Sequence, residues 1–405
     1  MLAALAVMLA LEGGLRLARE RFDGYLAQHE MDRSYSLRPN AEGWQASEGD
    51  VYVKINSDGL RDHERPVQRP VDTLRVAVVG PSDAEAIYVP LEQTFEAAME
   101  RNLAPLFQPR GNRVDVLNFG VLGYAQSQQY LTLHNHVWKY DPQLVVQVWN
   151  QIGLLRNTPE TDPWGAEMTP FYNLRNGRLE PAESTRALKS LSLFNPREIA
   201  IRNRLFDWMN RSYLLCMLKQ ATVNLQRQIG ELRAAVRLDF GGPTLAARLP
   251  EGFAQRWVYL PYQPEMQEDW EIGEAFVREM KADCDRHGAE YWVVIVDQPM
   301  QSNPDAAARD AFARKMGLPS LSESDLRLQR FCEANGIHVL RLAPRMGEYA
   351  AAHGLYLHTK ISDTEGHWNQ LGNRVAGQSI AEALRTQSPT VQAWEAGRRS
   401  NPTPR

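Results

Sequence analysis

Three short runs of apolar and β-branched residues, each ending in turn residues, constrain the fold of this chain most strongly. They lie at Leu74–Val79, Val114–Asn118 and Leu144–Trp149, and the segments 91–103 and 125–139 behind the first two have helical periodicity. Apolar strands that alternate with helices indicate a parallel sheet covered on both faces. Because ligands bind such sheets at the carboxyl ends of the strands, functional residues are expected just after these runs.

The alternation is interrupted by a long segment and then resumes. The interrupting segment, about 158–264, is polar at first and helical from about 203 to 238, which predicts a helical insertion. Residues 386–405 are full of Ser, Pro, Asn and Arg, so a disordered tail is expected. Between these two segments the pattern predicts a helix at 269–286, a strand at 291–296, a helix at 322–335, a strand at 337–340 and a last helix at 371–385.

Composition and charge exclude several classes of function. The 405 residues carry a formal net charge of −4 at pH 7, with acids and bases interspersed, so no nucleic-acid partner is expected. Cys216, Cys284 and Cys332 are far apart and lack CxxC spacing, which favours buried thiols over metal ligands. No His, Cys or carboxylate cluster has metal-ligand spacing. We therefore expect neither a metal nor another cofactor.

The first residues, Met1–Leu11, are wholly apolar and precede a charged stretch at 12–23. Eleven residues are about half of the roughly 20 that span a bilayer as a helix. Three interpretations stay open: an anchor whose start lies upstream, a helix docked on a membrane partner or in the interface, and a soluble core helix. The first is favoured, and it makes residues 1–22 a membrane anchor. The arginines that follow favour a cytoplasmic body, but neighbouring acids offset them.

A turn-rich extension, residues 34–73, precedes the main domain at 74–385. Within it Val51–Ile55 alternates between apolar and polar residues as a half-buried strand does. Asn56–Leu60 follows as a predicted tight turn. The extension is thus expected to be a small, separate preface to the α/β domain.

Four blocks, in order, resemble the membrane-associated branch of the SGNH (GDSL-type) hydrolase superfamily, from about Arg38 to Leu384. The resemblance implies a three-layer α/β/α fold with a mostly parallel sheet, which here carries a helical insertion and an N-terminal membrane helix. It also implies an exported, periplasmic body on a bacterial protein. The first block comprises Asn56–Arg61, Leu74–Ser82 and Val89–Phe95, the second is Val116–Tyr124, the third follows Trp149, and the last is Glu365–Asn369 with Gly372.

The resemblance assigns roles to individual residues. Ser82 matches the nucleophile, His367 the base and Glu365 the acid that orients it, as in other serine-based acyl transfer. The N–H groups of Ser82 and Gly120 match the oxyanion hole, which stabilises the charge of the tetrahedral intermediate. The expected chemistry is ester hydrolysis or acyl transfer. Without the resemblance, Ser82 is simply a turn or N-cap serine and His367 a buried histidine.

Two blocks depart from the family pattern. Pro81 replaces the usual Asp before the serine, and Asp83 follows it, where a negative charge opposes the developing oxyanion. In the third block Ile152 or Gly153 stands where the family has an oxyanion-hole Asn. Losing one such donor costs about 10²–10³ in rate. Asn150 lies two residues away, about 6.5 Å along a strand, too far to replace it without a bulge.

Two hypotheses follow for the function. The degenerate blocks favour a non-catalytic structural or binding subunit, tethered to a membrane by residues 1–22 and docked on a larger membrane-protein complex. The alternative is an active membrane-anchored serine esterase or O-acyltransferase. It would act on an acylated cell-envelope polysaccharide through Ser82, His367 and Glu365.

Overall fold

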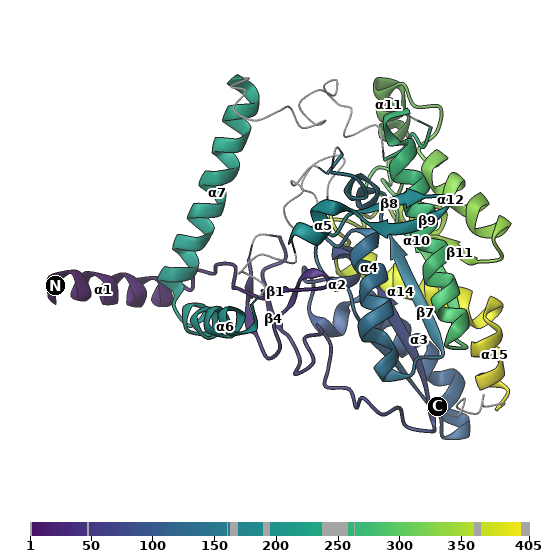
Figure 1. Ribbon diagram of the computed structural model, residues 1–405, viewed down its shortest axis with the longest axis horizontal. Coiled ribbons are helices and arrows are strands. Elements are labelled where there is room, and N and C mark those ends of the chain that lie inside the picture. Colours follow the sequence, from purple (N-terminus) through teal and green to yellow (C-terminus); the bar gives the residue numbers. More distant parts are fainter. Residues whose placement is uncertain are drawn as a thin grey trace.

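A computed structural model describes residues 2–46, 48–159, 161–162, 169–188, 195–236, 258–262, 264–359 and 366–397. Its centre is a five-stranded parallel sheet in the order β11-β10-β7-β5-β6 (Figure 1). The strands are β5 (Thr73–Val79), β6 (Arg113–Asn118), β7 (Leu144–Trp149), β10 (Glu290–Ile295) and β11 (His338–Arg341). In chain order this is the 2-1-3-4-5 arrangement of an open doubly wound sheet.

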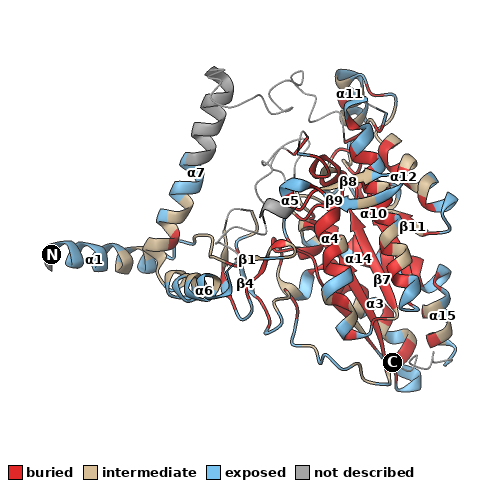
Figure 2. Ribbon diagram, viewed as in Figure 1, coloured by how far each residue is buried: buried red, intermediate tan, exposed pale blue. Residues whose placement is uncertain are grey.

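Helices cover both faces of this sheet, so the predicted three-layer α/β/α arrangement is confirmed. Successive residues of β5 point to opposite faces, with Val76 and Val78 in one core and Ala77 and Val79 in the other. Figure 2 shows the buried strands between the two helical layers. One layer contains α3 (Phe95–Phe107), α13 (Ala343–His353) and α14 (Gln370–Gln387), and the other α4 (Gln126–Thr132), α10 (Gln267–Arg286) and α12 (Glu323–Ala334). An outer helix, α11, spans Ala306–Met316.

The helices begin and end where side chains cap them, and the spacing of apolar residues alone does not give these boundaries. The predicted helix at 91–103 is a 3₁₀ turn, Leu91–Gln93, followed by α3, because Thr94 accepts a hydrogen bond from the N–H of Ala97 at 3.3 Å. The predicted helix at 125–139 begins as α4. It then continues as a π turn, Leu133–Val137, and a 3₁₀ turn, Trp138–Tyr140.

The inserted segment contains a hairpin and three helices in its described part. The hairpin joins β8 (Tyr172–Arg175) and β9 (Arg178–Pro181), and the helices are α5 (Glu183–Leu188), α6 (Pro196–Asn210) and α7 (Tyr213–Val236). The single helix predicted from 203 to 238 is therefore wrong. A new helix starts because Ser212 Oγ accepts the N–H of Leu215 at 3.2 Å, and the Glu12 carboxylate accepts the first N–H groups of α7.

Part of the predicted disordered tail is ordered. Residues Pro389–Glu395 form α15, and Val391 and Trp394 are buried in the first core. Ser388 caps the helix by accepting the N–H of Val391 at 3.1 Å, and Pro389 occupies the first helical position. Ser388 and Pro389, whose residue types favoured disorder in the sequence, together start this helix. Residues 398–405 lie outside the described part.

Two hairpins form the N-terminal extension, which therefore begins before residue 34. They are β1–β2 (Ala27–Glu30, Ser34–Leu37) and β3–β4 (Glu42–Gln45, Val51–Lys54), both antiparallel. The predicted strand at 51–55 and the turn after it are confirmed, since Asn56 Oδ1 accepts the N–H groups of Asp58 and Leu60. A third small core joins the extension to the α/β domain, and it contains Leu26, Leu37, Val53, Ile55, Ile87, Tyr88, Val121 and Tyr124.

Helix α1 (Leu2–Ala18) projects from the body beside α6 and α7 (Figure 1). It is attached at its C-terminal half, where Glu12 contacts the start of α7. Its outer part exposes apolar side chains, with Val7 58% and Leu9 64% exposed. Among the described residues, no helix has both the length and the apolar character needed to cross a bilayer. The membrane role of residues 1–22 stays a prediction.

Candidate active site

Ser82 lies at the point where the strand order reverses. β5 pairs with β6 on one side and β7 on the other, and the chain turns directly from β5 into the short helix α2 (Ser82–Glu85). The turn is tight: a Cβ on Gly80 would lie 2.8 Å from the Cβ atoms of both Ala84 and Val148. A side-chain-free residue there lets α2 start against β7, which places the serine where open α/β sheets bind ligands.

Ser82 and His367 meet across 285 residues of sequence. His367 Nε2 is 2.9 Å from Ser82 Oγ, and the other ring nitrogen, Nδ1, lies 3.0 and 2.9 Å from the two carboxylate oxygens of Glu48. The imidazole also stacks on the Tyr88 ring, with 4.0 Å between centroids. A hydroxyl, an imidazole and a carboxylate in this order form a nucleophile, a base and an orienting acid.

The acid in contact with His367 is therefore Glu48, which the sequence did not single out. Glu48 Oε1 also accepts the backbone N–H of His367 at 3.1 Å and the hydroxyl of Thr359. Glu365, the acid implied by the resemblance, lies outside the described residues. Glu48 belongs to the turn between β3 and β4, and no local pattern marks it, because its only distinction is its contact with a distant loop.

The loop that carries His367 is fixed on both sides. Trp368 Nε1 donates to Asp297 Oδ1 at 2.8 Å, next to the end of β10. The carbonyl of His367 accepts the N–H of Thr359 at 2.8 Å. Asn369 caps α14 by accepting the N–H of Gly372 at 2.9 Å. The Gly-His-Trp-Asn motif thus presents the imidazole, anchors the loop and starts a helix.

The charges around the imidazole favour its protonated form. Burial lowers the pKa of His367, but the hydrogen bond with Glu48 and the charges of Asp83, Glu48 and Glu85 raise it by more, so the net shift is upward. Burial raises the pKa of Glu48, and its hydrogen bond and ion pair with His367 lower it by more. Burial also raises the pKa of Glu85 to about 7, despite the N–H of Leu122 that its carboxylate accepts.

Gly120 is not positioned as the resemblance implies. Its N–H donates to Asn118 Oδ1 at 2.7 Å, and a Cβ on Gly120 would lie 2.4 Å from the carbonyl carbon of Ala84. Gly120 therefore allows close packing on α2 and does not present its N–H to the cavity. Gly123, three residues later, lines the cavity with φ +76°, and in the described part of the chain its N–H has no hydrogen-bond partner. Among the described residues of this block, Gly123 and not Gly120 therefore lines the cavity.

The third block offers no direct replacement for the missing Asn. Ile152 and Gly153 both line the cavity, but Ile152 has no polar side-chain atom and the N–H of Gly153 donates to the Asn150 carbonyl at 3.0 Å. Asn150 Nδ2 donates to Asp83 Oδ2 at 2.6 Å, and its Oδ1 accepts the N–H of Ile152 at 2.8 Å. The Asp83 carboxylate that follows the nucleophile is thus held by a side-chain amide.

These groups surround a cavity of about 570 Å³. That volume suits a small or medium ligand, and apolar walls flank a few convergent polar groups. The described lining residues are Tyr35, Pro81, Ser82, Asp83, Leu122, Gly123, Tyr124, Asn150, Ile152, Gly153, Arg156, Asp297, Gln298, Pro299, Gly366 and His367.

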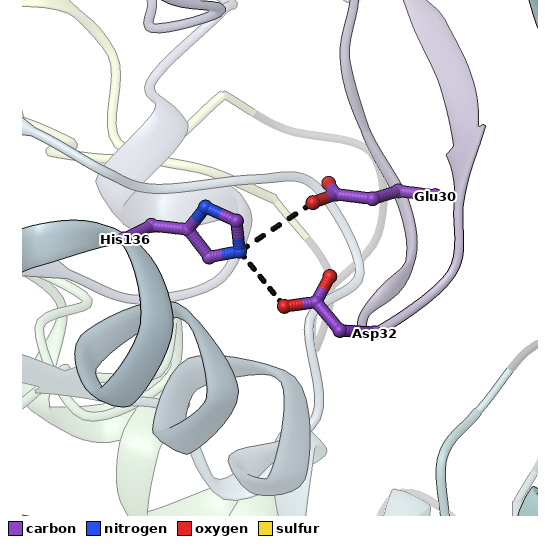
Figure 3. Close-up of side chains that lie close together, drawn as sticks. All are labelled: Glu30, Asp32 and His136. Carbon is purple, nitrogen blue, oxygen red and sulfur yellow. Dashed lines mark hydrogen bonds and ion pairs between the residues drawn. The ribbon is translucent and has the colours of Figure 1, made fainter. Parts of the chain in front are cut away.

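A second cluster of polar side chains lies apart from this cavity (Figure 3). His136 Nε2 is 2.8 Å from Asp32 Oδ2 and 3.4 Å from Glu30 Oε1, a donor set that could bind a metal ion. Arg33, however, already forms ion pairs with both carboxylates. The cluster is therefore interpreted as an ion-pair network. Cys216, Cys284 and Cys332 are all buried and form no disulfide.

Comparisons with known proteins give structural matches only. No family model and no curated protein matches the chain. Thirteen chains of solved structures match, two acetylxylan esterases and a GDSL-like lipase among them. The acetyl xylan esterase AlAXEase matches at 10% identity and TM-score 0.36, over 77% of this chain and 100% of the other.

Two further structures match at similarly low identity and TM-score. The acetylxylan esterase Axe2 of Geobacillus stearothermophilus, solved as a catalytic mutant, has 10% identity and TM-score 0.36, with coverages of 77% and 93%. A GDSL-like lipase of Bacteroides thetaiotaomicron has 10% identity and TM-score 0.31, with coverages of 77% and 88%. These likenesses concern the fold alone. The parallel sheet and the serine at the strand-order reversal are features of an open doubly wound α/β fold.

Proposed function

We propose that this protein is a serine esterase or acyl transferase whose nucleophile, base and orienting acid are Ser82, His367 and Glu48. The observation that carries the proposal is the continuous chain of contacts from Ser82 Oγ through both ring nitrogens of His367 to Glu48. A turn serine needs no such partners. This arrangement is what an activated hydroxyl requires.

The proposed reaction proceeds in two halves. Ser82 Oγ attacks the carbonyl carbon of an ester, and its proton passes to His367 Nε2 while Nδ1–H stays bonded to Glu48. The tetrahedral intermediate then collapses, the C–O bond to the alcohol breaks, and the alcohol leaves with the proton from Nε2. Water, or an acceptor hydroxyl, repeats the sequence on the acyl-enzyme and releases Ser82.

The non-catalytic subunit remains the competing hypothesis. Its motivation is the absence of the third-block Asn at Ile152, together with the exposed apolar surface of α1. Membrane attachment through residues 1–22, a membrane-protein partner and a periplasmic location stay predictions under either hypothesis. An acylated cell-envelope polysaccharide also stays a prediction as the substrate of the active enzyme.

Labelling with a fluorophosphonate probe, read by mass spectrometry, separates the two hypotheses. We expect phosphonylation of Ser82 in the wild-type protein and none at that position in Ser82→Ala or His367→Ala. Ser57, a turn serine bonded to Glu64, serves as the internal control and should stay unlabelled. Absence of labelling in a sample whose folding is shown by a cooperative melting transition would refute the proposal and favour the non-catalytic subunit.

A further inference from the structure

The described lining of the cavity offers few groups that could stabilise an oxyanion formed at Ser82. Two of the described lining residues, Asp83 and Asp297, are acidic, and the amide donor expected at Ile152 is absent. An oxyanion formed at Ser82 would therefore lie near a carboxylate. Its backbone donors among the described lining residues would be the N–H groups of Ser82 and Gly123. One lining residue, Arg156, carries a permanent positive charge, and it is the only Lys or Arg among the described residues of this wall.

Arg156 belongs to the segment that normally carries the missing amide. It ends the 3₁₀ helix Gln151–Arg156, which follows β7 directly, one turn beyond Ile152. The side chain is nevertheless almost completely buried, at 6% exposure. A buried guanidinium that borders a cavity differs from a surface arginine, because its charge acts in a medium of low dielectric constant.

The guanidinium is held on the side of the cavity where Gly123 lies. Nη1 would be 3.3 Å from a Cβ placed on Gly123, which lines the cavity and whose N–H has no hydrogen-bond partner among the described residues. On its other side, Nη2 donates to Thr169 Oγ1 at 2.6 Å, and Nε is 3.5 Å from Asp162 Oδ1. Thr169 in turn donates to Asp162 Oδ2 at 3.1 Å. One guanidinium nitrogen thus donates to Thr169 and a second lies near the Asp162 carboxylate, on the side away from Gly123.

We propose that Arg156 is the third oxyanion-stabilising group and replaces the amide that Ile152 lacks. This inference rests on the proposed function. When Ser82 Oγ bonds to the carbonyl carbon, the π electrons of the C=O bond move to oxygen. That oxygen accepts hydrogen bonds from the N–H groups of Ser82 and Gly123 and from Nη1–H of Arg156. On collapse the electrons return, the C=O bond reforms and the alcohol leaves.

Steady-state kinetics of Arg156→Gln on a neutral ester, p-nitrophenyl acetate, tests this role. We expect kcat to fall about 10²-fold or more while KM changes less than about twofold, since the contact exists only in the transition state. Arg156→Lys keeps the charge but loses the planar guanidinium, so its kcat should lie between those of the wild-type protein and Arg156→Gln.

Two further variants separate this role from a structural one. Thr169→Val removes a partner of Arg156 but keeps the guanidinium, so its kcat should fall far less than that of Arg156→Gln. In the double variant Ile152→Asn with Arg156→Gln, the restored amide should recover at least about tenfold of the lost kcat. A purely structural arginine would give no such rescue.

The outcomes also distinguish this inference from the function on which it depends. If wild-type protein neither reacts with the fluorophosphonate probe nor turns over the ester, both proposals fail. If wild-type protein is active and Arg156→Gln keeps its kcat, the role of Arg156 is refuted alone. A rise in KM confined to anionic esters would equally refute it, since Arg156 would then bind a substrate carboxylate.

Discussion

Replacing Glu48 by Gln tests the central feature of the site. In the wild-type protein both carboxylate oxygens lie within 3.0 Å of His367 Nδ1, so Nδ1 carries the proton and Nε2 is free to accept that of Ser82. A Gln amide can instead donate to Nδ1, which selects the tautomer with the proton on Nε2. That tautomer cannot act as a base. The comparable substitution in serine proteases costs about 10⁴ in kcat, which is roughly 5 kcal/mol of transition-state stabilisation.

The pH dependence supplies a second signature of the same variant. Catalysis needs neutral His367, so kcat/KM should rise with pH through a pKa above the ordinary histidine value of about 6.5. The hydrogen bond with Glu48 is the largest of the influences that raise this pKa. Its removal should therefore move the acid limb of the residual activity to lower pH.

The assay is kcat/KM for a neutral ester from pH 5 to 9, with fluorophosphonate labelling as an independent readout. Glu365→Gln is the matched control, because it changes the same residue type next to the same histidine. We expect it to keep activity within about threefold of wild type. A large loss in Glu365→Gln together with normal activity in Glu48→Gln would refute the assignment of Glu48.

Four further predictions concern the residues around the site and the surrounding fold. Gly120→Ala should lower the free energy of unfolding by about 3 kcal/mol in urea titration, since its Cβ would overlap the Ala84 backbone. Gly123→Ala should cost only about 1–2 kcal/mol yet slow probe labelling. Because the pKa of Glu85 is raised to about 7, its contribution to stability is full below about pH 4.5 and is lost as pH rises through 7. Glu85→Gln should remove that pH dependence, roughly 3 kcal/mol, from unfolding curves. Trp394→Ala should cost about 3–5 kcal/mol by the same measurement if α15 belongs to the core, and a change below 1 kcal/mol would contradict this.

Local patterns were sufficient for the sheet, and the resemblance singled out two residues that the structure places 2.9 Å apart. All five strands were predicted within one or two residues, because strands covered by helices on both faces are mostly apolar. Ser82 and His367 stand in short motifs whose turns and caps are encoded by neighbouring residues. The departures at Pro81 and Ile152 were also visible in the sequence.

Only the tertiary structure decided which acid contacts His367 and which glycine lines the cavity. Glu48 and His367 are 319 residues apart, and their contact depends on the packing of the N-terminal hairpins against Ile87 and Tyr88, which follow α2. Gly120 and Gly123 look equivalent in sequence, but the N–H of Gly120 donates to Asn118, whereas that of Gly123 has no partner in the described part of the chain. Sequence periodicity reports which residues are buried within one element. The sites at which distant elements meet are fixed by long-range packing, which has no local pattern.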